Sequence, residues 1–136
     1  MTLHALLHIA DRDEPVTSEA IADMVSSNPV VVRRTLAGLR HGKLVRSTKG
    51  HGGGWELARP LAAITLGDIY DALEAPEVFA MADRTESPGC LVEQAVNRAM
   101  RGAFAEAEAV LLARFREVSL ADIAADVKRN DRRKKP

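Results

Sequence analysis

The feature that most constrains the fold is a short segment, residues 26–40, which reads Ser-Ser-Asn-Pro-Val-Val-Val-Arg-Arg-Thr-Leu-Ala-Gly-Leu-Arg. Asn28 is a favourable N-cap residue, and Pro29 suits the first position of a helix, where a missing N–H breaks no hydrogen bond. A rotation of ~100° per residue predicts one apolar face, made of Val32, Leu36 and Leu39. Arg34 falls almost opposite, among valines and small residues, whereas a water-exposed helix normally carries Glu and Lys there. The segment is therefore predicted to be a helix whose outer face contacts another molecule.

A helix-turn-helix is predicted because two shorter helices precede this segment. Residues 2–10 show an apolar helical pattern, and after a polar break Thr17 can cap a second helix over residues 18–25. Ser26 and Ser27 then supply a tight turn before the basic helix. In a helix-turn-helix the last helix enters the major groove of DNA.

A β-hairpin is predicted directly after the basic helix, with strands over residues 44–48 and 55–58. Its tip combines a cation, a histidine and glycines that let the backbone approach a ligand closely, namely Lys49, Gly50, His51 and Gly52. A hairpin in this place is the wing of a winged helix. A nucleotide phosphate loop is disfavoured, because no Gly-Lys-Ser/Thr ending and no helix follow these glycines. Trp55 is interpreted as a core aromatic that anchors the wing, with stacking on a base as the alternative.

The charges of the chain are segregated although the formal net charge is zero. Residues 29–60 contain seven Lys and Arg against one Glu, whereas residues 61–127 contain twelve acids against five bases. A basic block of this size is typical of a surface that binds a polyanion. A solvated basic surface is the alternative that charge alone leaves open.

A long helix is predicted over residues 91–117, because this stretch contains no Pro and only one Gly. Its apolar residues recur at spacings of three and four, and a length of ~40 Å exceeds what a small wing domain needs for its own core. We interpret residues 91–118 as the interface of a homodimer, with packing back onto the same chain as the alternative.

The predicted fold class is mainly α with a small β-hairpin, arranged in four segments. They are a winged helix-turn-helix DNA-binding domain (1–75), a linker loop (76–90), the dimerisation helix with a short C-terminal helix (91–127), and a basic disordered tail (128–136).

Other classes of protein are disfavoured by the sequence. No run approaches the ~18 apolar residues of a membrane span and no signal pattern begins the chain, so a cytoplasmic location without membrane contact is expected. The single cysteine excludes an intrachain disulfide. His4 and His8 have the i, i+4 spacing of a metal-binding pair, but no third ligand follows in register, so no metal or cofactor is expected. No serine elbow or Cys–His pairing indicates an enzyme.

Three motifs in order resemble the Rrf family of bacterial winged-helix regulators. They are Ser-Asn-Pro-Val-Val-Val-Arg-Arg at 27–34, Lys-Gly-His-Gly-Gly-Gly-Trp-Glu-Leu-Ala-Arg-Pro at 49–60, and Ile-Thr-Leu-Gly-Asp-Ile-Tyr at 64–70. The resemblance covers residues 3–127 and implies a homodimeric transcription regulator that binds a palindromic operator through the basic helix and the wing. Cluster-binding members carry three cysteines where this chain has only Cys90, so an iron–sulfur cofactor is not implied. Members begin several residues earlier, so either the start of this chain is assigned late or those N-terminal contacts to DNA are missing.

We therefore predict a sequence-specific regulator of double-stranded DNA, most simply a repressor. The predicted DNA-binding residues are Ser27, Asn28, Val30, Val31, Arg33, Arg34, Lys49, Gly50, His51 and Gly52. Arg34 is expected at a guanine edge and the two valines at thymine methyls, whereas Arg33 and the wing tip are assigned to the DNA backbone. The alternative function is a protein-interaction module that keeps the winged-helix fold with little affinity for an operator.

Cys90 is the candidate redox sensor of the sequence. It lies at the predicted start of the long helix, where the helix dipole favours a thiolate, while Glu86 and Glu93 oppose that charge. A small buried apolar residue is the alternative interpretation, because free cysteines are often buried.

Overall fold

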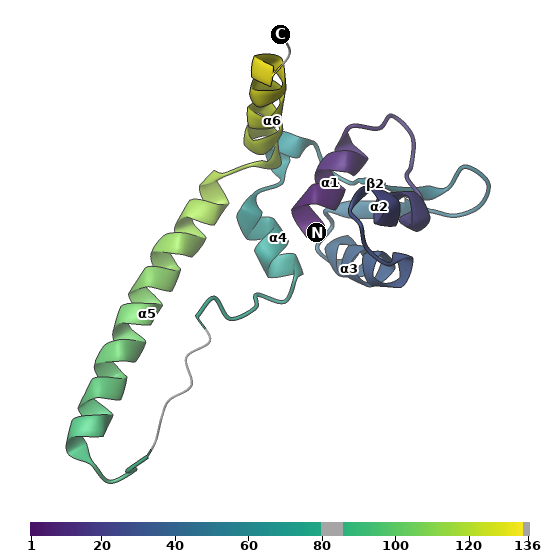
Figure 1. Ribbon diagram of the computed structural model, residues 1–136. Coiled ribbons are helices and arrows are strands. Elements are labelled where there is room, and N and C mark those ends of the chain that lie inside the picture. The colour runs from purple at the N-terminus through teal and green to yellow at the C-terminus, as the bar shows by residue number, and fades with distance from the viewer. Residues whose placement is uncertain (80–85, 135–136) are drawn as a thin grey trace.

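The computed structural model describes residues 1–79 and 86–134. Its elements in chain order are α1 (Thr2–Ala10), α2 (Ser18–Met24), α3 (Pro29–His41), β1 (Val45–Thr48), β2 (Gly54–Leu57), the 3-10 helix η1 (Leu61–Ala63), α4 (Leu66–Ala72), α5 (Leu91–Glu117) and α6 (Leu120–Lys134). Figure 1 shows α1, α2 and α3 gathered around the foot of the β-hairpin, while α5 extends away from them as a long arm. The mainly α fold with a small hairpin, a winged helix-turn-helix, confirms the predicted fold class.

The helix starts follow the capping residues of the sequence. The Thr17 hydroxyl accepts a hydrogen bond from the N–H of Ala20, and the Asn28 side chain accepts one from the N–H of Val30 at 2.7 Å. Each cap satisfies a backbone donor that the first turn of a helix cannot pair internally. The predicted starts of α2 and α3 are therefore confirmed.

The core of the winged-helix domain lies between the three N-terminal helices and the hairpin. Its largest fully buried side chains are Leu6, Ile21, Val32, Leu36, Leu39, Leu44, Val45, Ile64 and Leu120, each 0–1% exposed. The apolar face predicted for α3 is thus buried as expected. Leu120 comes from beyond α5, so the chain returns to this core after the long helix.

The hairpin is attached to the helices through its second strand. β1 and β2 pair antiparallel with Ser47 opposite Trp55, and the N–H and C=O of Trp55 also exchange hydrogen bonds with Val16, at 2.8 and 2.9 Å. Gly54 permits this approach, because a Cβ there would lie 2.6 Å from the Val16 carbonyl oxygen. Trp55 is 9% exposed, and this confirms its interpretation as a core anchor of the wing.

A capping box closes the start of α4, another closes the start of α6, and the two starts lie side by side. Thr65 with Asp68, and Ser119 with Asp122, each exchange side-chain and backbone hydrogen bonds across three residues. Backbone bonds join the two starts, from Leu66 N–H to Val118 C=O and from Leu120 N–H to Ile64 C=O. The end of α5 is therefore held against the winged-helix domain by main-chain bonds.

α3 and α4 approach closely along a seam of small residues. A Cβ on Gly42 would lie 2.7 Å from the Cβ of Ala72, and one on Gly38 would lie 3.4 Å from the carbonyl oxygen of Ala72. α4 in turn packs against α5, where Tyr70 and Phe115 meet edge to face. α4 therefore lies between the basic helix and the long helix.

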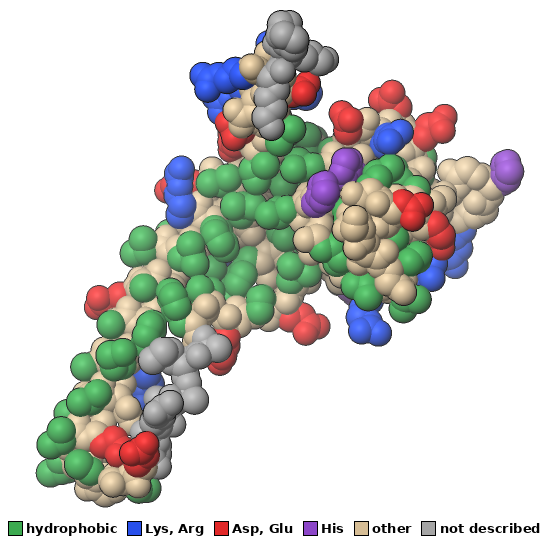
Figure 2. All heavy atoms as spheres, viewed as in Figure 1, with side chains coloured by type: hydrophobic (Ala, Val, Ile, Leu, Met, Phe, Trp, Pro, Cys, Tyr) green, Lys and Arg blue, Asp and Glu red, His purple; other side chains and the backbone are tan. Residues whose placement is uncertain are grey.

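α5 spans the predicted range and buries none of its residues. Val92 is 72% exposed and Val96 is 54% exposed, although both are apolar. Phe104 contacts Phe79 from the loop after α4, with ring centroids 5.3 Å apart. Figure 2 shows apolar side chains spread along this arm, and among the described residues little covers them.

The prediction of a disordered tail over residues 128–136 is wrong for the residues that the structure describes. α6 continues from Leu120 to Lys134, because this stretch contains no Gly or Pro. Asp126 also accepts hydrogen bonds from Arg129 and Asn130, which lie three and four residues further along the helix. Such contacts stabilise a helix and offset the repulsion among its basic residues. The remaining two residues of the tail lie outside the described part.

Candidate nucleic-acid interface

The outer face of α3 presents one arginine between apolar side chains. Val30 is 55% exposed and Val31 is 44% exposed, and Arg34 is exposed beside them. Within residues 1–79 and 86–134 the guanidinium of Arg34 makes no hydrogen bond or ion pair. A cation with no partner in the protein can bind an external acceptor without first breaking a bond. This face therefore offers both a forked donor and methyl groups to a ligand.

The wing tip is a second exposed group of donors. Lys49 and His51 are exposed, and Gly50 and Gly52 have φ values of +91° and +75°. Glycine adopts such positive φ angles without strain, which allows the tight turn closed by the Gly53 N–H to the Gly50 carbonyl at 3.0 Å. The tip therefore exposes the Lys49 charge, the His51 ring and glycine backbone that no side chain covers.

The base of the wing is joined to the helix-turn-helix by a buried hydrogen bond and by an exposed arginine. The indole N–H of Trp55 donates to the Ser18 hydroxyl at 2.9 Å, and both residues are buried. Arg40 from α3 lies over the Trp55 ring, 6.0 Å from its centroid, and donates to the Ser47 hydroxyl. The hairpin and α3 are therefore held as one surface.

Besides Asn28, which caps α3, two of the predicted DNA-binding residues have side-chain partners within the chain. Arg33 donates to the Glu19 carboxylate at 2.8 Å, across the turn between α2 and α3. The Ser27 hydroxyl lies 3.5 Å from the sulfur of Met1. The sequence pattern carries no signal for either contact, because each partner lies more than ten residues away along the chain.

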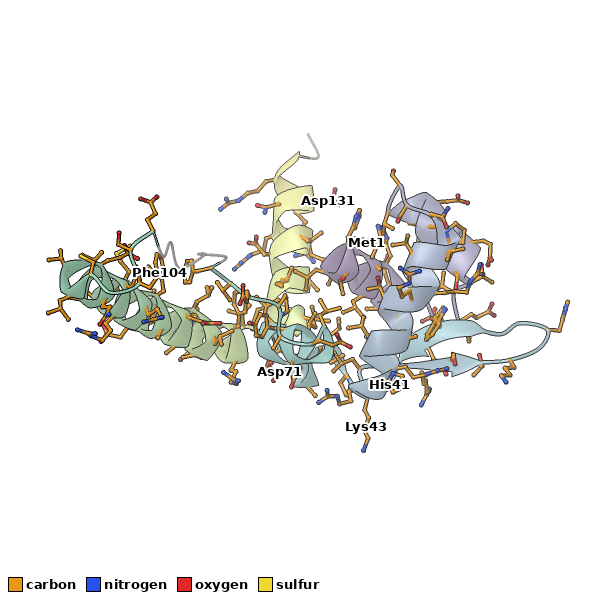
Figure 3. The ribbon with its side chains drawn as sticks, turned by 90° about the horizontal axis from the view of Figure 1, so that it is seen from below. Met1, His41, Lys43, Asp71, Phe104 and Asp131 are labelled. Carbon is orange, nitrogen blue, oxygen red and sulfur yellow. The ribbon has the colours of Figure 1, made fainter. Side chains whose placement is uncertain are left out.

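Lys43 and Arg40 also belong to this surface, although sequence reasoning did not single them out. Lys43 follows the end of α3 with φ +56°, and its side chain extends away from the protein (Figure 3). Both residues lie in the basic block 29–60, so the charge count alone was the signal that could have found them. Figure 2 shows Lys and Arg side chains gathered on the side of α3 and the hairpin opposite to a group of acids.

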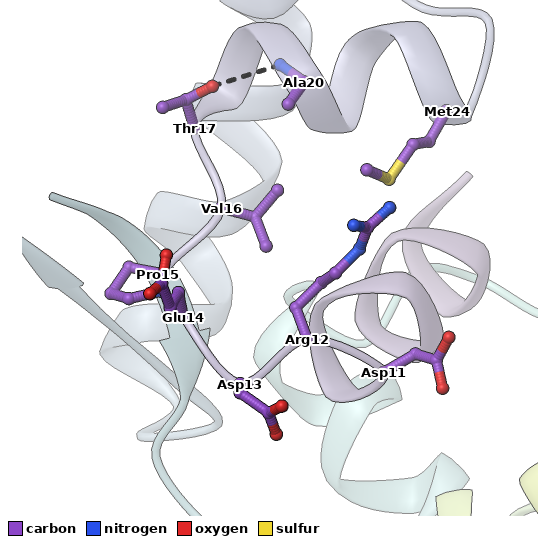
Figure 4. Close-up of a pocket in the computed structure, with 9 residues that line it drawn as sticks. All are labelled: Asp11, Arg12, Asp13, Glu14, Pro15, Val16, Thr17, Ala20 and Met24. Carbon is purple, nitrogen blue, oxygen red and sulfur yellow. Dashed lines mark hydrogen bonds between the residues drawn. The ribbon is translucent and has the colours of Figure 1, made fainter. Parts of the chain in front are cut away.

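Those acids border a hollow between the end of α1 and α2. It is lined by Asp11, Arg12, Asp13, Glu14, Pro15, Val16, Thr17, Ala20 and Met24 (Figure 4). Arg12 extends across the hollow toward Met24 (Figure 4). Three carboxylates beside one arginine repel phosphate, so this hollow is not part of the nucleic-acid interface.

Two other candidate chemical groups lie at the start of α5 and on α1. Cys90 is exposed and occupies the N-cap position of α5, with no side-chain cap hydrogen bond. His4 and His8 contact each other through their Nε2 atoms at 2.9 Å on α1. No group of three or more His, Cys, Asp or Glu that could hold a metal occurs in the described part of the chain. None of its helices is both long and apolar enough to cross a membrane.

Comparison with known proteins agrees with this architecture. The family description "Rrf2: Iron-dependent Transcriptional regulator" matches residues 1–126. The chain is 30% identical over 118 residues to YwnA of Bacillus subtilis, a candidate HTH-type transcriptional regulator, covering 87% of this chain and 88% of YwnA.

Solved structures extend the similarity to the fold. A candidate transcriptional regulator from Lactobacillus plantarum superposes with a TM-score of 0.78 at 26% identity, covering 93% of this chain and 87% of that one. CymR, the global cysteine regulator of Bacillus subtilis, superposes with a TM-score of 0.67 at 24% identity, covering 90% and 89%.

The family description names iron, and the residues of this chain do not fit an iron–sulfur cluster held by three cysteines. The sequence has one cysteine, so a single chain supplies one thiolate. Cys90 is also exposed rather than enclosed by other ligands.

Proposed function

The chain belongs to the Rrf2 family of winged-helix transcription regulators, and from this premise we propose that it binds a palindromic operator as a homodimer and represses transcription. DNA-binding regulation is the role that the family indicates. The proposal adds which residues meet the DNA and how two copies assemble.

The observation that carries the proposal is the continuous surface formed by α3 and the wing. Arg34 has no partner among the described residues, Val30 and Val31 are exposed beside it, and Lys49 extends the same basic surface at the hairpin tip. Asn28 closes the start of α3, whose remaining N–H groups suit a phosphate. We assign Arg34 to a guanine edge in the major groove and the wing tip to the backbone or minor groove.

The test is footprinting of bound genomic DNA, followed by titration of the recovered operator. Arg34→Ala should weaken specific binding by about 1–3 kcal/mol and relax the base preference at one position. Unchanged operator affinity would remove Arg34 from the interface. If the native chain shows no salt-dependent binding to any duplex, the protein-interaction module becomes the better interpretation.

A homodimer is supported by the uncovered apolar face of α5. Apolar side chains that one chain leaves in water are stabilised when a second copy covers them. Val96→Glu places a charge within this face, whereas Ala105→Glu places the same charge on the opposite side of the helix, nine residues along. Sedimentation analysis should show a weakened dimer for Val96→Glu only. Equal behaviour of the two variants would contradict this interface.

Regulation through Cys90 is a second element of the proposal, supported by its exposure at the start of α5. Peroxide would convert the thiol to a sulfenic acid and release water. Operator affinity measured before and after peroxide should change in the native chain and stay constant in Cys90→Ser. A native chain that binds equally well after oxidation would show that Cys90 is not the sensor.

A further inference from the structure

An ion pair joins the two helices of the helix-turn-helix at the edge of the proposed interface. Arg33 Nη1 donates to Glu19 Oε1 at 2.8 Å, and both side chains are more than half exposed. Exposed pairs of this kind contribute little to the stability of a fold, because water screens the charges and ordering two long side chains costs entropy. Stability alone therefore gives no strong reason for this contact.

The ion pair lies next to the residues that are proposed to bind DNA. Glu19 lies in the first turn of α2, and Arg33 lies in the second turn of α3, beside Val30 and Arg34. The pKa of Glu19 is lowered by its backbone hydrogen bond at the start of α2 and by the Arg33 guanidinium. The carboxylate is therefore ionised wherever the protein meets DNA at neutral pH.

The cations of the surface fall into two kinds. Arg33 is paired with Glu19, and Arg46 on the wing is paired with Glu56 across the strands at 2.6 Å. Arg34 and Lys49 form no ion pair within residues 1–79 and 86–134. A protein cation that binds a DNA phosphate releases a counterion from the DNA. A cation that is paired with a carboxylate can do this only after the ion pair breaks.

We propose that Glu19 is a positioning residue that holds Arg33 away from the DNA backbone and lowers the affinity of the interface for phosphate. This inference rests on the proposed function of the α3 surface. The Glu19 carboxylate acts in two ways, because it occupies the Arg33 guanidinium and also repels phosphates that approach α2. Binding then depends more on the unpaired cations, among them Arg34, than on the total charge of the basic block.

The test compares Glu19→Gln with the native chain on a random-sequence duplex over a series of salt concentrations. Gln has nearly the same size and no charge. We expect binding at a given salt concentration to strengthen about three- to tenfold, and the dependence of log K on log salt to steepen by about 1. The operator recovered by footprinting should show a similar gain.

Two further variants separate this effect from a change in net charge. Glu14→Gln removes the same charge from the exposed loop before α2 and should leave the salt dependence close to native. In an Arg33→Gln background, Glu19→Gln should no longer steepen the salt dependence.

A Glu19→Gln chain that binds both duplexes with native affinity and native salt dependence overturns the inference and leaves the proposed function intact. An equal gain in Glu14→Gln, or the full gain in the Arg33→Gln background, also overturns it. A native chain without salt-dependent binding overturns both proposals.

Discussion

Removal of the Ser18 hydroxyl should disturb the joint between the wing and the helix-turn-helix. This hydroxyl is the acceptor for the indole N–H of Trp55, and both residues are buried. Ser18→Ala leaves that N–H inside the core without its partner. The substitution creates only a small void, so the unpaired donor dominates its effect.

The expected loss follows from two opposing contributions. A buried donor without an acceptor costs about 1–3 kcal/mol. Alanine is the better helix former at the start of α2, which recovers about 0.5 kcal/mol at most. A net loss of roughly 1–2 kcal/mol remains, and for a chain of this size it corresponds to a fall in Tm of roughly 3–8 °C.

Urea unfolding of Ser18→Ala, Ser87→Ala and the native chain measures this loss. Ser87 is exposed and its hydroxyl has no partner among the described residues, so its variant should match the native chain. In a Trp55→Phe background, which lacks the indole donor, Ser18→Ala should cost much less. A Ser18→Ala free energy of unfolding within about 0.3 kcal/mol of native would refute the argument, since the indole would then have another acceptor.

Four other substitutions have expected outcomes. Lys49→Ala should weaken binding to all DNA sequences alike and lower the salt slope by about 1, which salt titrations on two unrelated duplexes would measure. Gly42→Ala should destabilise the chain by about 1–3 kcal/mol in urea unfolding, because its Cβ would meet Ala72. Gly102→Ala should stabilise the chain by about 0.5–1 kcal/mol, because its Cβ would meet nothing within 4 Å and alanine favours the helix. The pKa of Asp122 is lowered by its hydrogen bonds from Ser119, so its contribution to stability is present above the usual aspartate pKa and is lost as the pH falls through the lowered value. The difference in Tm between the native chain and Asp122→Asn should therefore shrink in acid, and a constant difference would contradict this.

The elements that sequence reasoning predicted correctly are those determined by local chemistry. Asn28 and Pro29 mark the start of α3, and Thr17 marks the start of α2. The bounds predicted for the long helix, 91–117, are those of α5. Each of these signals acts within a few residues, where spacing along the chain determines distance in space.

The features that the sequence did not predict depend on residues far apart in the chain. Arg33 and Glu19 are separated by a turn whose geometry decides that they meet. The contact of Ser27 with Met1, and of Trp55 with Val16, requires the packing of α1 and the hairpin. The length of α6 was not predicted for a different reason: a high density of basic residues indicates disorder, whereas here the helix continues to Lys134.

The backbone hydrogen bonds between the starts of α4 and α6 give α5 a fixed direction relative to the winged-helix domain. The bonds from Leu66 to Val118 and from Leu120 to Ile64 fix one end of α5 to the body that carries α3. In the proposed dimer, the point along α5 at which two copies cross would then determine the distance between the two α3 helices. Each residue inserted in α5 between these hydrogen bonds and the crossing point would lengthen the helix by about 1.5 Å and rotate the partner by about 100°. In that dimer, the length of α5 would set the separation of the operator half-sites, about 34 Å for one turn of DNA, although α5 itself need not touch DNA.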